Sequence, residues 1–461
     1  MTTKVATERS TGPWTLIAAA TGFLMVSLDA TIVNVALPTL SRELGAGLTE
    51  LQWVVDGYTL MFAALLLTGG SLGDRLGARR VFAGGLGLFA LASLACGLAV
   101  SPAMLIAARF VQGIGAAAQL PASLAMIRHG YPGQAERTRA IAIWAAAGGA
   151  AVAAGPVLGG LLIAALGWRS LFLVNLVIGA IGLLLTTRAA APSPGTGRRL
   201  DLPGQLAAVL TLCALTFGLI EGGSLGWSSL PVQAALAAAV VGGALFVWWE
   251  RRTAEPMLPT RLFARPASSS AGVVGFAMNF AYYGIVFLLS LFLQNQRGYS
   301  ALVTGLMFLP MTATVTAANL LGGRLTGRLG PKVPMVAGQL LFAVGLLGLL
   351  WAGHTAPDWV IWLAMLPIGI GGGITVPAMT SALLESVEPA HAGVASGALN
   401  GVRQVGGAVG VALFGTLVSG GFLPGLRLSL AIASSVLAVG ALTAARWAPR
   451  HCRVAQRNPQ P

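Results

Sequence analysis

Residues 69–80 read GGSLGDRLGARR, and a related stretch, GGRLTGRLGPK, occupies residues 322–332. Both contain the pattern G-x-L-x-x-R-x-G, and each separates two long apolar runs. A bilayer's hydrocarbon core needs about 20 apolar residues per helical crossing, which is the length of these runs. Polar turns that recur at equivalent places in an apolar chain predict a membrane protein built from two related halves.

The same alternation of apolar run and short polar break covers most of the chain. Hydrophobic residues make up 56% of it and charged residues only 9%, far from the composition of soluble domains. The spacing predicts an all-α membrane protein with fourteen transmembrane helices. They are expected at 14–40, 51–73, 80–99, 103–125, 139–162, 168–188, 203–221, 231–249, 270–294, 301–322, 333–352, 358–384, 394–418 and 424–446.

The basic residues set the orientation of these helices, because Lys and Arg stay on the cytoplasmic side. With the N-terminus inside, cytoplasmic segments hold 22 of the 28 Lys and Arg residues. Outer loops hold Arg42, Arg169, Arg297 and Arg427, and only Arg109 and Arg403 lie within crossings. Both termini are therefore expected in the cytoplasm, with the chain a multi-pass protein of the plasma membrane. The 26 Arg against 2 Lys, with abundant Ala and Gly, indicate a GC-rich bacterial genome.

Two long cytoplasmic breaks, at 189–202 and 250–269, combine Pro, Gly, Ser and charged residues, a composition typical of linkers. They divide the helices into two sets of six with a pair between them. The predicted organisation is a tail at 1–13, a six-helix bundle at 14–188, the linker 189–202, inserted helices 7 and 8 at 203–249, the linker 250–269, a second six-helix bundle at 270–446 and a tail at 447–461.

Composition argues against several other classes of protein. The net charge of +14 belongs to a membrane-facing cytoplasmic surface, because no compact basic domain with interleaved aromatics is present to bind nucleic acid. Cys96, Cys213 and Cys452 are too scattered for a disulfide framework or a metal site. The four histidines fall in loops or the tail, and no nucleotide-binding loop or catalytic domain is evident. Neither an enzyme nor a metal site is expected.

Polar groups inside the crossings are costly in lipid and therefore indicate function. Asp29 lies about fifteen residues, or roughly 22 Å, into the first crossing. An ionised carboxylate at that depth costs about 2.5–3.5 kcal/mol on insertion scales. Desolvation favours its neutral form, so Asp29 is a candidate to bind and release a proton. Asp56, at a similar outer depth in the second crossing, is the second candidate. The alternative for Asp29 is a structural hydrogen bond to a neighbouring helix.

The fourth crossing carries a polar stripe that must face the protein interior. Arg109, Gln112 and Gln119, with Ala116 and Ser123, lie within about 80° of one another at 100° per residue. Arg109 stays charged and can favour the ionised form of a nearby carboxylate. Depth groups it with Asp29 and Asp56 as a proton-coupling site. The alternative is an ion pair that only locks helices together.

Other charges within the crossings have weaker claims to a role. Glu221 is near the outer end of the seventh crossing, where it could simply face the headgroup region. Ser396, Asn400 and Arg403 form a second inward stripe on the thirteenth. Arg403 could repel cations, hold an anionic group or pair with Glu385 at the inner mouth. A structural or gating role is favoured over direct substrate contact.

The ninth crossing has an aromatic face. Phe276, Phe280, Tyr283 and Phe287 lie within about 60° of one another. Phe280 and Tyr283, with Gln112, Gln119 and Asn400, are therefore candidates to line a central cavity. Aromatic walls suit bulky apolar or cationic drugs through stacking and cation–π contacts. Ordinary packing or lipid contact is the alternative.

Six ordered motifs give the chain a resemblance to a known family. Besides 70–80, they are LDATIVNVALP (28–38), RFVQGIGAA (109–117), GPVLGG (155–160), WRSLFLVNLVIG (168–179) and VASGALNGVRQVGGAVGVALFG (394–415). Nearly the whole chain resembles the major facilitator superfamily, specifically its fourteen-helix drug:proton antiporter branch. Within that branch it is most similar to actinobacterial antibiotic exporters of the methylenomycin-resistance type. One departure is Ala151, where the branch commonly has Gly; Ala still permits close helix contact.

The resemblance implies proton-coupled efflux of antibiotics or other amphipathic drugs by alternating access of two six-helix bundles. It assigns Arg109 to proton coupling and Gly155, Pro156, Gly159 and Gly160 to the antiporter motif. Gly70, Asp74, Arg75, Gly77 and Arg79 would form the cytoplasmic gate loop, with a salt-bridge latch between the halves. Protons would be the coupling ion with no other cofactor, the partners would be a small-molecule drug and the lipid bilayer, and the protein would work as a monomer. A proton-linked metabolite or nutrient transporter on the same fold is the alternative.

Overall fold

The structure, a computed structural model, describes residues 12–189, 201–253, 256–258, 260–353, 356–388 and 392–450. Most of the predicted linker 189–202 and of the two predicted tails lies outside these residues. Fourteen helical segments in the described part are long and apolar enough to cross a membrane. The helices are α1 Gly12–Ile32, η1 Val33–Ala36, α2 Leu37–Leu44, α3 Leu48–Leu76, α4 Ala78–Gly97, α5 Pro102–Gly130, α6 Gln134–Leu166, α7 Ser170–Ala189, α8 Leu202–Ser224, α9 Leu230–Glu250, η2 Thr260–Ala264, α10 Pro266–Leu291, η3 Phe292–Gln296, α11 Ala301–Met307, α12 Leu309–Leu329, α13 Lys332–Gly348, η4 Leu349–Trp351, α14 Asp358–Glu385, α15 Ala392–Ser419 and α16 Phe422–Trp447.

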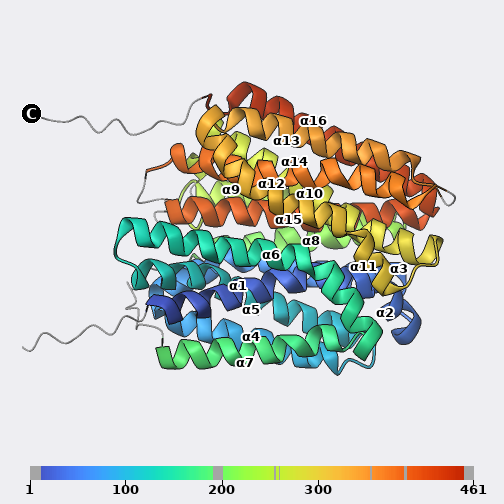
Figure 1. Ribbon diagram of the computed structural model, residues 1–461, viewed down its shortest axis with the longest axis horizontal. Helices are drawn as coiled ribbons and strands as arrows, with labels where there is room; N and C mark the ends of the chain where they lie inside the picture. The colour runs from blue at the N-terminus through green and yellow to red at the C-terminus, as the bar shows by residue number, and fades with distance from the viewer. Residues whose placement is uncertain are drawn as a thin grey trace, which may run out of the picture.

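The helices form two bundles, as Figure 1 shows: α1–α7 in blue to green and α10–α16 in yellow to red. Helices are the expected solution because lipid offers no hydrogen-bonding partner for backbone N–H and C=O groups. Within each bundle glycines bring neighbouring helices into backbone contact. A Cβ on Gly113 of α5 would lie 2.4 Å from the carbonyl oxygen of Tyr58 on α3, and one on Gly345 of α13 would lie 2.6 Å from that of Ala364 on α14. Small residues at these positions permit the close packing that stabilises helix pairs in a membrane.

Two crossings predicted as single helices are broken near their outer ends. The first is interrupted by the 3₁₀ turn η1, and α2 restarts with Pro38 in its first turn. The tenth is interrupted at Phe308, and α12 restarts with Pro310 in its first turn. Proline removes a backbone N–H, and its ring clashes with the carbonyl four residues earlier. The predicted crossings 14–40 and 301–322 are each confirmed as one membrane-spanning segment, Pro13–Leu44 and Ala301–Leu329, with a local irregularity at these prolines.

The inserted pair α8 and α9 docks at the boundary between the bundles. The side-chain amide of Gln205 on α8 donates to a carbonyl of α3 at 2.9 Å. Near the outer end of α8, Glu221 accepts from the indole N–H of Trp53 on α3 at 3.0 Å. Thr416 on α15 donates to the carbonyl of Leu219 at 2.7 Å. The helix α8 therefore contacts both bundles, and α9 packs against α8.

Candidate functional site

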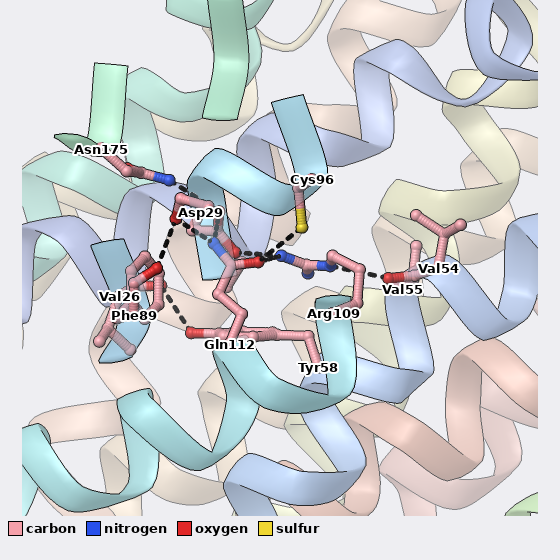
Figure 2. A network of polar contacts seen from close by, with 12 residues as sticks. Val26, Asp29, Val54, Val55, Tyr58, Phe89, Cys96, Arg109, Gln112 and Asn175 are labelled. Carbon is pink, nitrogen blue, oxygen red and sulfur yellow. Dashed lines mark hydrogen bonds and ion pairs between the residues drawn. The ribbon is translucent and has the colours of Figure 1, made fainter. Parts of the chain in front are cut away.

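The N-terminal bundle holds a buried ion pair between two of its helices. Asp29 on α1 is 0% exposed and Arg109 on α5 is 1% exposed. The Nη1 of Arg109 donates directly to Oδ2 of Asp29 (Figure 2). Its Nε donates to the carbonyl oxygen of Val54 on α3 at 2.9 Å. Asp29, Asp56 and Arg109 were grouped by their similar depth in the membrane, and the structure brings Asp29 and Arg109 into contact.

The other carboxylate oxygen of Asp29 is held by two amides. Gln112 Nε2 donates to Oδ1 at 2.8 Å and Asn175 Nδ2 donates to the same atom at 3.1 Å. Gln112 also accepts from Nη1 of Arg109 at 2.6 Å and donates to Ser93 at 2.9 Å. Asp29 therefore accepts from three side chains, which is the environment of an ionised carboxylate.

Tyr58 on α3 covers the ion pair. The guanidinium carbon of Arg109 lies 4.4 Å from the centroid of the Tyr58 ring, a cation–π contact. The Tyr58 hydroxyl donates to the carbonyl of Val26 on α1 at 3.1 Å (Figure 2). Aromatic, amide and backbone groups therefore replace water around both charges.

Two members of this cluster, Asn175 and Tyr58, did not emerge as site residues from the sequence. Asn175 stands in the quoted segment WRSLFLVNLVIG, where an amide amid apolar residues was a signal for an inward-facing group. Tyr58 follows Asp56 by two residues on α3. Its side chain contacts α1, whereas Asp56 lies on the face of α3 that meets α15. The partner of Tyr58 could not be inferred from one crossing, because contacts between helices depend on how each is rotated.

Asp56 lies outside the cluster. It is 0% exposed, and neither carboxyl oxygen has a hydrogen-bonding partner among the described residues. Gln52, one turn earlier on α3, donates to the carbonyl of Ala412 on α15 at 2.7 Å. Four residues correspond to about 40° of rotation, so Asp56 shares the face of α3 that meets α15. It occupies the boundary between the bundles, and no Lys or Arg of the described residues forms an ion pair with it.

The predicted cavity-lining residues separate into two groups. Gln112, Gln119 and Phe280 are at most 3% exposed and line no open space in this conformation. Phe280 stacks on Phe276 and meets the edge of Phe414 on α15 with ring centroids 5.0 Å apart. Helix packing covers these three side chains in this conformation, so their role in lining a cavity remains a prediction. Tyr283 and Asn400 are partly exposed.

Arg403 lies on the C-terminal side of the same boundary. Its Nη1 donates to Oδ1 of Asn400 at 3.1 Å and its Nε to Oδ1 of Asn279 on α10 at 3.4 Å. No carboxylate of the described chain lies within ion-pair distance of it. Glu385, the suggested partner, is exposed at the end of α14 and accepts from Ser381 at 3.4 Å. That pairing was therefore wrong.

Glu221 is part of the docking of α8 described above. Besides Trp53, it accepts from the hydroxyl of Ser224 at 2.5 Å. Glu221 therefore joins α8 to α3 near the outer end of α8, and the headgroup-facing alternative remains untested. Its carboxylate thus has a docking contact and no contact with the Asp29 cluster.

The antiporter motif joins α6 to two helices. A Cβ on Gly155 would lie 2.0 Å from the hydroxyl of Thr31 on α1. A Cβ on Gly160 would lie 2.7 Å from the carbonyl of Ala301, where α11 of the other bundle begins. Gly159 likewise faces α1, and the carbonyl of Pro156 faces Gly305 of α11. The motif therefore brings the two bundles together at their outer ends in this conformation.

The gate-loop residues are mostly helical rather than part of a loop. Gly70, Asp74 and Arg75 lie in α3 and Arg79 lies in α4. Gly77 separates the helices with φ of +92°, a left-handed conformation that glycine adopts without strain. Arg79 donates to the carbonyls of Thr186 at 3.1 Å and Thr187 at 2.6 Å, which ties α4 to α7 of the same bundle. The latch between the halves remains a prediction.

Comparisons with known proteins agree with this architecture. The chain matches the Major Facilitator Superfamily over residues 19–411. It is 42% identical to the methylenomycin A resistance protein of Streptomyces coelicolor, covering 87% of this chain and 85% of that protein. It is 41% identical to the multidrug resistance protein Stp of Mycobacterium tuberculosis, covering 88% and 75%.

Solved structures share the fold. A bacterial homologue of the human lysosomal transporter Spinster has a TM-score of 0.65 at 16% identity, covering 96% of this chain and 98% of that protein. Fourteen crossings and two bundles place the protein among multi-pass transporters of the plasma membrane, which are not enzymes. By family match, sequence identity and fold, the chain belongs to the major facilitator superfamily.

Proposed function

We propose that the protein exports antibiotics or other amphipathic drugs from the bacterial cell in exchange for protons, as a monomer. The relatives at 42% and 41% identity are named for resistance to methylenomycin A and to multiple drugs. The antiporter motif, at the outer contact between the bundles, fits a cycle in which one bundle rocks against the other.

The observation that carries proton coupling is the buried carboxyl of Asp56, whose oxygens have no hydrogen-bonding partner among the described residues. An ionised carboxylate without partners is far more costly in this environment than a neutral one. Asp56 is therefore the group that we expect to hold a proton while the outer side is closed. Asp29 was the first candidate from the sequence, but in this conformation its two carboxylate oxygens already accept hydrogen bonds from three side chains.

The position of Asp56 suggests how a proton would be coupled to movement. It lies about 12 Å into α3 from the outer side, on the face against α15 of the other bundle. A proton taken up from outside lets this face close over a neutral side chain. When the inner side opens, water reaches Asp56 and the proton leaves to the cytoplasm. Drug release to the outside precedes the next protonation.

The test is drug-dependent proton movement in liposomes that contain the purified protein and a trapped pH-sensitive dye. Ethidium, chloramphenicol and methylenomycin A serve as the test drugs. We expect at least one of them to drive proton movement in the wild type. Asp56→Asn should abolish this movement and pH-driven drug accumulation, yet retain exchange of labelled for unlabelled drug. Exchange needs alternating access without net proton transfer.

The matched control is Glu136→Gln, which neutralises an exposed acid at the start of α6. It should behave like the wild type. Wild-type liposomes without drug-dependent proton movement for any of the three drugs would contradict the proposed function. Unchanged pH-driven transport by Asp56→Asn would contradict the role of Asp56 alone.

A further inference from the structure

The polar cluster around Arg403 has more hydrogen-bond donors than acceptors. A guanidinium offers five N–H groups and accepts none. Its acceptors in the described chain are one oxygen each of Asn400 and Asn279. The side-chain amide nitrogen of Asn279, a residue only 2% exposed, has no acceptor among the described residues. The cluster thus has a positive charge and unused donors but no anion.

The cluster faces the inside of the transporter rather than the inserted pair. Thr416, which donates to α8, marks the side of α15 that faces that pair. At 100° per residue Asn400 lies about 160° from Thr416 and Arg403 about 140° from it. Both are partly exposed although they lie in the middle of a crossing. A lipid-facing position for a permanent charge is strongly unfavourable, so the exposed part belongs to the protein interior.

An apolar surface adjoins these polar groups. The ring of Tyr283 on α10 packs within 2.9 Å of the Cβ position of Gly407, one turn outward from Arg403. Phe276, also partly exposed, precedes Asn279 on the same helix. The aliphatic part of Arg403 lies 3.0 Å from the Cβ position of Gly275 and is held against α10. Aromatic rings beside a guanidinium and two amides match a molecule with one flat apolar part and one anionic group.

We propose that Arg403, with Asn279 and Asn400, binds the carboxylate of amphipathic organic acids, which are therefore a substrate class of this exporter. The inference rests on the proposed export function for its biological meaning, whereas binding itself can be measured without transport. A carboxylate supplies two acceptor oxygens and one negative charge, which are what the cluster lacks. Its planar shape matches the fork of the guanidinium.

Binding of 2-naphthoate and of its uncharged analogue 2-naphthamide to the purified protein separates charge from shape. We expect the wild type to bind the carboxylate about tenfold more tightly or better, as charge-assisted hydrogen bonds imply. Arg403→Gln should bring the two affinities to about the same value while leaving naphthamide binding unchanged. Arg403→Lys should retain an intermediate preference, because it keeps the charge but loses the fork. Arg427→Gln, which removes an exposed arginine of α16, should match the wild type.

Asn400→Ala is the second variant in case Arg403→Gln does not fold, and it should lower carboxylate affinity several-fold without changing naphthamide affinity. Equal wild-type affinities for the two probes, or a preference that survives Arg403→Gln, would overturn the proposal. Displacement of naphthoate by chloride at equal concentration would also overturn it, since Arg403 would then be a site for small inorganic anions.

Transport in liposomes distinguishes a failure here from a failure of the proposed function. Proton-coupled export of ethidium without carboxylate preference leaves the export function standing and refutes this inference. Carboxylate preference without drug-dependent proton movement supports the binding site and contradicts the exchange mechanism.

Discussion

Two arginines of the membrane-spanning helices, Arg109 on α5 and Arg403 on α15, have opposite surroundings. Arg109 is buried with a carboxylate, a glutamine, a backbone carbonyl and an aromatic ring around it. Arg403 is partly exposed and meets only amide oxygens among the described residues. A charge whose partner is built in holds helices in place. A charge without one is available to a ligand.

The same contrast separates Asp29 and Asp56, two buried acids of the N-terminal bundle. Asp29 accepts from three side chains, whereas Asp56 has no partner in the described chain. Both lie at similar depth, so desolvation alone does not distinguish them. The difference is the neighbouring charge, which stabilises one ionised form and leaves the other without compensation.

The largest expected effect on stability comes from breaking the buried ion pair between Asp29 and Arg109. Asp29→Asn leaves Arg109 buried without a counter-charge, and removing one partner of such a pair costs about 3–5 kcal/mol of stability. Thermal unfolding of the purified protein should show a correspondingly large fall in Tm, and transport should be lost. The double variant Asp29→Asn/Arg109→Gln removes both charges and should recover part of the lost stability. A double variant less stable than Asp29→Asn would contradict the built-in pairing.

A smaller loss of stability should follow from removing a hydrogen bond to Asp29 while keeping the charges of Asp29 and Arg109. Asn175→Leu deletes one hydrogen bond to Asp29, and a bond to a charged group contributes about 1.5–3 kcal/mol. The same unfolding measurement should place this variant between the wild type and Asp29→Asn. Thr187→Val on the same helix, an exposed position, is the control. If the two variants were equally stable, Asn175 would not be part of the site.

The smallest effect is expected at Glu221, which is neither part of the Asp29–Arg109 ion pair nor a candidate to carry the proton. Glu221→Gln keeps an oxygen acceptor for Trp53 and Ser224, so its stability should change by at most about 0.5 kcal/mol. Drug-dependent proton movement should remain within about twofold of the wild type, since no proton step is assigned to Glu221. A loss as severe as that expected for Asp56→Asn would move Glu221 into the coupling machinery.

Part of the site followed from the sequence. The polar stripe of α5 was expected to face inward because a helix in lipid can hide only one side, and Arg109, Gln112, Gln119 and Ser123 are all buried. The approach of Arg109 to Asp29 followed from their similar depth. Depth could not separate Asp56 from that pair, and it could not reveal Asn175 or Tyr58. Aromatic periodicity pointed to Phe280 as a cavity wall, although the residue packs on α15 instead.

The sequence by itself determined the number of crossings and the helix faces that avoid lipid, and it predicted the orientation of the crossings, because hydrophobicity and charge act on each segment through the bilayer alone. Only the tertiary structure decided which acid has a cation, which arginine has none and where α8 rests. Those outcomes depend on how each helix is rotated against its neighbours, and a hydrogen bond or ion pair forms or fails over about an ångström of displacement.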